Sequence, residues 1–303
     1  MKILSDFDGV LTELGDEARR THALFDEAVE AAARDAGVGD SGLRRLLAET
    51  EAAMTARPWR HGWRVKDRIT AFADEDGFIR VNAATAALDA AADLGEEDAA
   101  KLREGLRAAG LADFRAAAQR AYLRMAEETA AGKLHPLAAE SRDVLDALLT
   151  RGHDVVVVSN SSTERILKLL RGAGVPCAAH GDDARGKVRV RGDAKKFVLG
   201  DHPAITPVGD YAVETDRPHY AEILRDERPN VVIGDVFSLD LALPLALARA
   251  GGDAFRGLHA VLRRRPYTPA WSSSHVAALS DPSHRASAVD RLEQLLAKME
   301  QSR

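Results

Sequence analysis

Three short apolar runs constrain the fold of this chain more than any other feature of its 303 residues. They lie at residues 3–4, 155–158 and 231–233, and a polar side chain follows each within two residues. Apolar runs of this length, bounded by turn signals, are typical of buried strands in parallel sheets. The residues between the second and third runs are patterned partly as helices. Strands alternating with helices predict a doubly wound, Rossmann-like α/β fold with a parallel sheet.

The segment between the first two runs has a different composition. Residues 14–135 are rich in alanine, leucine, arginine and glutamate and poor in β-branched residues, which favours helices. We therefore predict an all-helical cap domain at residues 13–135, inserted after the first strand. The remaining residues, 1–12 and 136–303, would form the α/β core domain. An insert at this point is well placed to cover an active site.

Within the core, three further elements are predicted from local patterns. Charged and apolar residues alternate over 187–199, which predicts a strand pair or hairpin. Residues 286–299 are patterned as a C-terminal helix, and residues 272–275 as a loop. We find no function in the sequence of residues 180–216.

Composition excludes several classes of protein. A net charge of −5 gives no general attraction to nucleic acid or to anionic membranes. The single cysteine, Cys177, can form no internal disulfide, which fits a reducing compartment. The chain enters a candidate strand at once and has no run of 18 uncharged apolar residues. We therefore expect a cytoplasmic protein whose partner is a small molecule; its oligomeric state is not predicted.

Polar side chains at the three strand ends predict a site for chemistry. Asp6 and Asp8 follow the first run, Ser159 follows the second, and Asp235 follows the third. The carboxyl ends of parallel strands share one edge of the sheet, where open α/β proteins bind ligands. Carboxylates gathered there repel one another, and a bound cation relieves that repulsion.

These segments also carry a family resemblance. Asp6-Phe7-Asp8-Gly9-Val10-Leu11-Thr12 resembles the first motif of the haloacid dehalogenase (HAD) superfamily. Residues 155–160 resemble its second motif and residues 232–240 its fourth, in the same order and strand context. The predicted insert also lies where that family places a helical cap. The resemblance therefore implies a HAD-type phosphatase.

The resemblance implies a role for each residue near the reacting phosphorus. Asp6 would attack phosphorus and form an aspartyl-phosphate. Asp8 would protonate the leaving alcohol and then activate water. Ser159 and the backbone amide of Asn160 would bind phosphoryl oxygens, and Gly9 would also lie at the substrate.

A metal ion and a substrate class also follow from the resemblance. Mg²⁺ would be bound by Asp6, the backbone carbonyl of Asp8, and Asp235, with Asp240 just outside this ligand set. Family members that cleave carbon–halogen bonds generally lack an aspartate at the position of Asp8. We therefore expect a small phosphorylated metabolite as the substrate.

The resemblance also implies a basic residue near the phosphoryl group, and the sequence offers two main candidates for it. The family usually has a lysine before a proline at this point, but here Arg217 precedes the proline. Lys196 is the other candidate, and the sequence does not choose between Lys196 and Arg217. Lys187 and Lys195 are weaker candidates.

Other functions remain open at this stage. A phosphomutase or phosphotransferase would use the same core residues, and a receiver-like signalling domain or a non-catalytic binding protein belongs to a different class. Residues 59–66 of the insert interleave basic and aromatic side chains. Such interleaving occurs in anion-binding or base-stacking sites, although an amphipathic turn explains it better.

Overall fold

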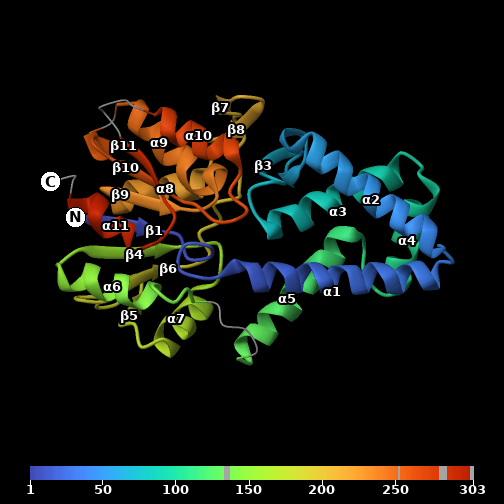
Figure 1. The fold of residues 1–303 in the computed structure, drawn as a ribbon, viewed down its shortest axis with the longest axis horizontal. Helices are drawn as coiled ribbons and strands as arrows, with labels where there is room; N and C mark the ends of the chain where they lie inside the picture. Colours follow the sequence, from blue (N-terminus) through green and yellow to red (C-terminus); the bar gives the residue numbers. More distant parts are fainter. Residues whose placement is uncertain (133–136, 252, 280–284, 301–303) are drawn as a thin grey trace. The chain divides into compact units, whose positions relative to one another are not determined.

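The protein is described by a computed structural model that covers residues 1–132, 137–251, 253–279 and 285–300. Its chain divides into two compact units (Figure 1). The first consists of Met1–Leu14 and Pro136–Arg303, and the second of Gly15–His135. In the described residues, no helix is long and apolar enough to cross a membrane.

A seven-stranded sheet, parallel throughout, forms the centre of the first unit. Its strands are, in spatial order, β11 (Arg285–Val289), β10 (His259–Arg263), β9 (Val231–Gly234), β1 (Lys2–Ser5), β4 (Asp154–Val158), β6 (Val188–Arg191) and β5 (Cys177–Ala179). The strand β1 lies in the middle, and the chain adds strands on both sides of it. This confirms the predicted doubly wound, Rossmann-like α/β core.

Both faces of the sheet are covered. Ile3 pairs with Val155 and Val231, and all three belong to one apolar cluster with residues of three helices. The next residues along β1 and β4, Leu4 and Val156, point to the other face because side chains alternate along a strand. They are also buried. Burial on both faces explains why these strands are continuous apolar runs in the sequence.

Helices and a hairpin connect the strands of the first unit, and one more helix follows the last strand. They are α6 (Ser141–Thr150), α7 (Thr163–Gly172), the hairpin β7 (Ile205–Val208) and β8 (Tyr211–Glu214), α8 (Pro218–Glu227), the π-helical turn η2 (Phe237–Leu241), α9 (Ala242–Arg249), the 3₁₀ turn η3 (Asp253–Phe255), α10 (Ala270–Ala278) and α11 (Gln294–Glu300). Among these, α6, α7 and α11 contribute to the apolar cluster that contains Ile3.

Three local predictions for the core are wrong. Residues 187–199 contain one strand, β6, which joins the parallel sheet instead of forming a pair. Residues 272–275 lie in helix α10, and the predicted C-terminal helix begins as the edge strand β11. The strand predicted within 187–199 does form, but it pairs with β4 and β5, and pairing of β11 with β10 overrides a helical pattern, as tertiary context commonly does.

The second unit is mostly helical. Its elements are α1 (Leu14–Asp35), α2 (Asp40–Ala56), the 3₁₀ turn η1 (Pro58–Arg60), the hairpin β2 (Gly62–Val65) and β3 (Arg68–Phe72), α3 (Gly77–Asp93), α4 (Glu97–Ala108) and α5 (Phe114–Ala130). The hairpin corrects the expectation of an all-helical insert. Its antiparallel pairing satisfies backbone groups in a stretch that has no helical periodicity. Asp76 and Asp113 cap α3 and α5 through their side chains.

A buried carboxylate ties α8 to the sheet. Glu227, whose side chain is 3% exposed, accepts hydrogen bonds from Lys2 of β1 and from Arg189 and Arg191 of β6. Burial opposes its ionisation, but the three cationic donors outweigh burial and lower the pKa of Glu227 to about 2. The last residue of α8 is therefore held by two strands that lie on either side of β4.

We predict that Glu227→Gln destabilises the first unit by about 2 kcal/mol at pH 7, because three cations lose their common partner while remaining partly screened by water. The pKa of Glu227 is lower in the folded protein than its ordinary value of 4.5. Its contribution is therefore present above about pH 4.5 and is lost as the pH falls toward 2. Urea denaturation at pH 7 and pH 3 measures this difference.

The matched control is Asp226→Asn, which removes an exposed partner of Arg191. This variant should change stability by less than about 0.5 kcal/mol. Equal destabilisation by the two substitutions at pH 7 would contradict the role given to Glu227.

Candidate active site

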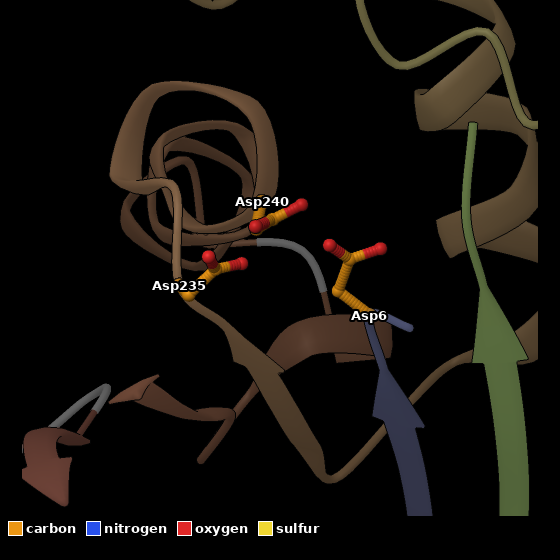
Figure 2. Close-up of side chains that lie close together, drawn as sticks. All are labelled: Asp6, Asp235 and Asp240. Carbon is orange, nitrogen blue, oxygen red and sulfur yellow. The ribbon is translucent and has the colours of Figure 1, made fainter. Parts of the chain in front are cut away.

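The carboxyl edge of the sheet gathers the predicted site residues. Ser5 of β1 pairs with Val157 of β4 and with Ile233 of β9. Asp6 follows its strand at once, and Asp235 lies two residues beyond Ile233. Figure 2 shows Asp6 at the tip of β1, with Asp235 and Asp240 beside it and their carboxylates directed toward one another. Residues more than 200 positions apart in the sequence are thus brought together by the strand order.

Asp6, Asp235 and Asp240 form a group in which one carboxylate oxygen of each residue lies within 4.8 Å of the other two. Asp235 and Asp240 are buried, and Asp6 is partly buried. Burial raises the pKa of Asp6, and the charges of Asp240 and, to a smaller degree, Asp8 raise it further. Lys196 opposes these effects, and the resulting pKa of Asp6 is about 8.

One buried lysine lies between two of these carboxylates. Lys196 Nζ donates to Asp6 Oδ1 at 2.7 Å and to Asp240 Oδ1 at 2.6 Å. Its side chain is 2% exposed, and its Nζ also lies 5.6 Å from the ring centroid of Tyr220. Despite burial, the charges of Asp240 and Asp6 raise the pKa of Lys196 above its ordinary value. The lysine is therefore a fixed positive charge at this edge.

The loop after β6 delivers this lysine. The backbone amide of Lys196 donates to Asn160 Oδ1 at 2.7 Å, which ties the loop to the end of β4. Asp193 and Lys195 have φ values of 54° and 49°, a left-handed conformation that non-glycine residues seldom adopt. The asparagine predicted to contact substrate through its amide thus also positions Lys196.

Gly9 is required by a close approach to Asp235. Its φ is 76°, and a Cβ at this position would lie 1.9 Å from Asp235 Oδ2. No side chain fits in that space. The glycine therefore allows the turn after β1 to pass directly beside the carboxylate that follows β9, while its predicted contact with substrate stays a prediction.

Asp8 faces a different set of groups. Its Oδ2 accepts from Ser159 Oγ at 3.1 Å and from Ser161 Oγ at 2.7 Å. Its Oδ1 lies 3.0 Å from Arg165 Nη1. The Asp8 side chain is not part of the group formed by Asp6 and its two neighbours, and the expected metal contact through its backbone carbonyl stays a prediction.

Arg217, the other basic candidate, hydrogen-bonds backbone carbonyl groups. Arg217 is buried and donates from Nη1 to the carbonyl of Lys196 at 2.6 Å and from Nε to the carbonyl of Glu214 at 3.2 Å. It thus braces the loop that carries Lys196. The two weaker candidates, Lys187 and Lys195, are exposed.

Three residues that contact the predicted carboxylates were not predicted from the sequence. Tyr267, from the loop after β10, donates to Asp235 Oδ2 at 2.7 Å. Arg165 and Ser161 contact Asp8. The serine follows the second motif directly and could have been considered from its place alone, whereas the tyrosine and the arginine depend on the tertiary fold.

The segment 59–66 lies in the second unit, in η1 and the hairpin. Arg64 and Lys66 are exposed, while Trp59 and Trp63 are half-buried. This arrangement resembles the amphipathic turn that the sequence favours. An anion-binding role for the segment stays a prediction.

The donor set at the sheet edge fits a hard divalent cation. Carboxylate oxygens are the ligands that Mg²⁺ prefers, and Asp6, Asp235 and Asp240 offer three within 4.8 Å. Three carboxylates with one lysine leave an excess of negative charge, and burial together with the charge of Asp240 raises the pKa of Asp6. A divalent cation would compensate that excess.

Solved structures similar to this chain include two bacterial proteins. One is YfnB of Bacillus subtilis, described as a HAD hydrolase bound to magnesium, with 14% identity, a TM-score of 0.42, and coverage of 99% of this chain and 98% of that one. The other is a 2-haloacid dehalogenase of Pseudomonas syringae, with 14% identity, a TM-score of 0.42 and coverage of 99% of both chains.

A third similar structure is a haloacid dehalogenase-like hydrolase of Xanthomonas campestris, with 15% identity, a TM-score of 0.41, and coverage of 100% of this chain and 96% of that one. No protein-family model matches the chain, and the search of curated proteins found no significant match.

We predict that magnesium binding to this site releases a proton. Asp6, with a pKa of about 8, is largely protonated at pH 7 and must be ionised to bind a cation. Affinity should therefore rise roughly tenfold per pH unit from pH 6 to pH 8 and level off above it. Calorimetric titration in buffers of different ionisation enthalpy measures the protons released; affinity independent of pH over this range contradicts the assignment.

Without magnesium, the raised pKa of Asp6 makes the stability of the folded protein fall as the pH rises. The folded state binds this proton more tightly than the unfolded chain, whose aspartate has an ordinary pKa of 3.8. The contribution of Asp6 to stability is therefore present below about pH 4 and is lost as the pH rises through 8. Added magnesium should then raise the melting temperature more at pH 8 than at pH 6.

Proposed function

We propose that this protein is a HAD-superfamily hydrolase that cleaves small phosphate monoesters with the help of magnesium. Its second unit, inserted after the first strand of the core, would correspond to the cap of that family. The proposal rests on the resemblance of three strand-end motifs and on the chemistry that their side chains can perform. The substrate would be a small phosphorylated metabolite.

The observation that most supports this function is the different surroundings of Asp6 and Asp8. Asp6 lies against Lys196 and two further carboxylates, whereas Asp8 contacts two serine hydroxyls and the guanidinium of Arg165. Two carboxyl groups in separate environments can take separate roles in one reaction. Ionised in the presence of magnesium, Asp6 would serve as the nucleophile, and Asp8, which lies outside the group of three carboxylates, would serve as the acid and base.

The first half of the reaction transfers the phosphoryl group to the protein. A carboxylate oxygen of Asp6 attacks phosphorus, and the bond between phosphorus and the alcohol oxygen breaks. Asp8 gives its proton to the departing oxygen, so that a neutral alcohol leaves. Lys196 holds Asp6 Oδ1 at 2.7 Å and thereby fixes the orientation of the attacking carboxylate.

The second half returns the protein to its starting state. Asp8 takes a proton from water, and the water oxygen attacks the phosphorus of the aspartyl-phosphate. The bond between phosphorus and Asp6 breaks, and inorganic phosphate leaves. The hydroxyl of Ser159 and the backbone amide of Asn160 would hydrogen-bond the phosphoryl oxygens in both steps.

Magnesium bound among Asp6, Asp235 and Asp240 would supply positive charge against both the carboxylates and the phosphoryl oxygens. Residues of the chain already orient two of these carboxylates in the absence of a metal ion. Tyr267 fixes Asp235 through a 2.7 Å hydrogen bond, and the amide of Val236 donates to Asp240 Oδ2 at 3.1 Å. Both carboxylates are thus oriented by neighbours, which lowers the cost of assembling the site.

We predict that Asp6→Asn abolishes turnover of 4-nitrophenyl phosphate, because an amide cannot replace the attacking carboxylate. Asp8→Asn should lower kcat by roughly 10²–10⁴-fold, the usual contribution of general acid–base catalysis. Initial rates with magnesium measure both effects, and Asp182→Asn, an exposed aspartate of the same unit, serves as the control. Full activity of Asp6→Asn would falsify the assignment of the nucleophile.

A second prediction separates the two basic candidates. Lys196→Met should lower kcat by more than about 10²-fold, since the charge beside Asp6 is lost. Arg217→Met leaves two backbone carbonyls without their buried donor, which should lower stability by roughly 2–4 kcal/mol. At a temperature where it is folded, this variant should keep at least about a tenth of the wild-type kcat. The opposite ranking of the two variants contradicts the assignment of Lys196.

A further inference from the structure

Three side chains donate hydrogen bonds to Asp8, more than a carboxyl group needs in order to act as a proton donor. Ser159, Ser161 and Arg165 all converge on one carboxylate, at 3.1, 2.7 and 3.0 Å. The two serines are buried, whereas the side chains of Asp8 and Arg165 are 25% and 17% exposed. Asp8 and the guanidinium of Arg165 are therefore partly accessible to solvent, whereas the serine donors behind them are not.

The direction of each hydrogen bond follows from the atoms involved. Arg165 can only donate, so Ser161 Oγ accepts from Arg165 Nη1 at 2.9 Å and gives its own proton to Asp8. The backbone amide of Ser161 likewise donates to Ser159 Oγ at 3.1 Å, and the Ser159 proton goes to Asp8. All three groups therefore donate to the Asp8 carboxylate, the serines to Oδ2 and Arg165 to Oδ1, so hydrogen-bond donors suited to an anion are gathered here.

Arg165 is not needed to start its helix. Ser162 caps α7 by accepting from the amide of Arg165 at 3.3 Å, and Thr163 Oγ1 accepts from the amide of Gly192 at 3.1 Å. The first turn of α7 is thus held by its cap and by the loop after β6. Capping of α7 therefore uses the backbone amide of Arg165 and not its guanidinium.

The position of Arg165 relative to the reaction follows from the role of Asp8. A proton donor lies within about 3 Å of the leaving oxygen, and Arg165 Nη1 lies 3.0 Å from Asp8 Oδ1. The guanidinium is therefore within roughly 6 Å of the leaving oxygen, two hydrogen bonds away. A carboxyl oxygen that turns to the leaving group also releases at least one of its present donors.

We propose that Arg165, supported by Ser161, binds an anionic group on the leaving alcohol. The substrate would then be a phosphate monoester whose alcohol carries a carboxylate or a second phosphate within two or three carbons of the ester oxygen. A guanidinium binds either group through charge-assisted hydrogen bonds. This inference rests on the proposed phosphatase function and on Asp8 as the proton donor.

Three esters of one chain length test the proposal in the whole protein with magnesium. They are 3-hydroxypropyl phosphate, which is neutral beyond its ester, 3-(phosphonooxy)propanoate, and propane-1,3-diyl bisphosphate. The wild type should have a kcat/KM about 10- to 100-fold higher for at least one anionic ester than for the neutral one, as a charged hydrogen bond supplies. The better of the two anionic esters identifies the group as carboxylate or phosphate.

Arg165→Met should reduce this ratio to within about threefold of one, and Arg165→Lys should retain part of it. Any effect that acts only through Asp8 cancels in the ratio, because all three esters use the same acid. The matched control is Arg171→Met, the same change at an exposed arginine of α7, which should leave the ratio unchanged.

Two results would overturn the proposal, and they are distinguishable from failure of the function itself. A wild type that hydrolyses 4-nitrophenyl phosphate but does not prefer either anionic ester contradicts it without any variant. So does a preference that survives Arg165→Met. If 4-nitrophenyl phosphate and all three esters remain intact, the phosphatase function is wrong, and the inference fails with it.

Discussion

The ammonium group of Lys196 lies between Asp6 and Asp240, and the candidate site depends on this contact. It joins the end of β1, the π-helical turn η2 and the loop after β6, three segments that are far apart in the sequence. Buried carboxylates repel one another, and a buried lysine without a partner is costly. Each charge is tolerated because the others are present, so the substitution of any one of them leaves the others unbalanced.

The parts of this site that follow strand ends could be predicted from the sequence. Strands buried on both faces are continuous apolar runs, which locates β1, β4 and β9 without an alignment. In a doubly wound sheet, the ends of these strands lie at one edge, and Asp6, Ser159 and Asp235 follow from that rule. The doubly wound fold and the meeting of the strand ends therefore needed only periodicity and topology.

Other parts depend on contacts that no local pattern contains. Lys196, and not Arg217, contacts Asp6 because of the conformation of its loop. In that loop, Asp193 and Lys195 have positive φ. Arg165 looks like any helical arginine until the fold places it beside Asp8. The edge strand β11 has a sequence that also suits a helix, and only pairing with β10 decides between them.

The central claim is that Asp6 carries the phosphoryl group during turnover. Acid quenching during steady-state hydrolysis, followed by borohydride reduction, converts an aspartyl-phosphate to homoserine, which peptide mass spectrometry locates. The account predicts homoserine at position 6 in the wild type and much less of it in Lys196→Met, in which the carboxylate is poorly oriented. Homoserine at another aspartate in the wild type, with none at position 6, would contradict the account.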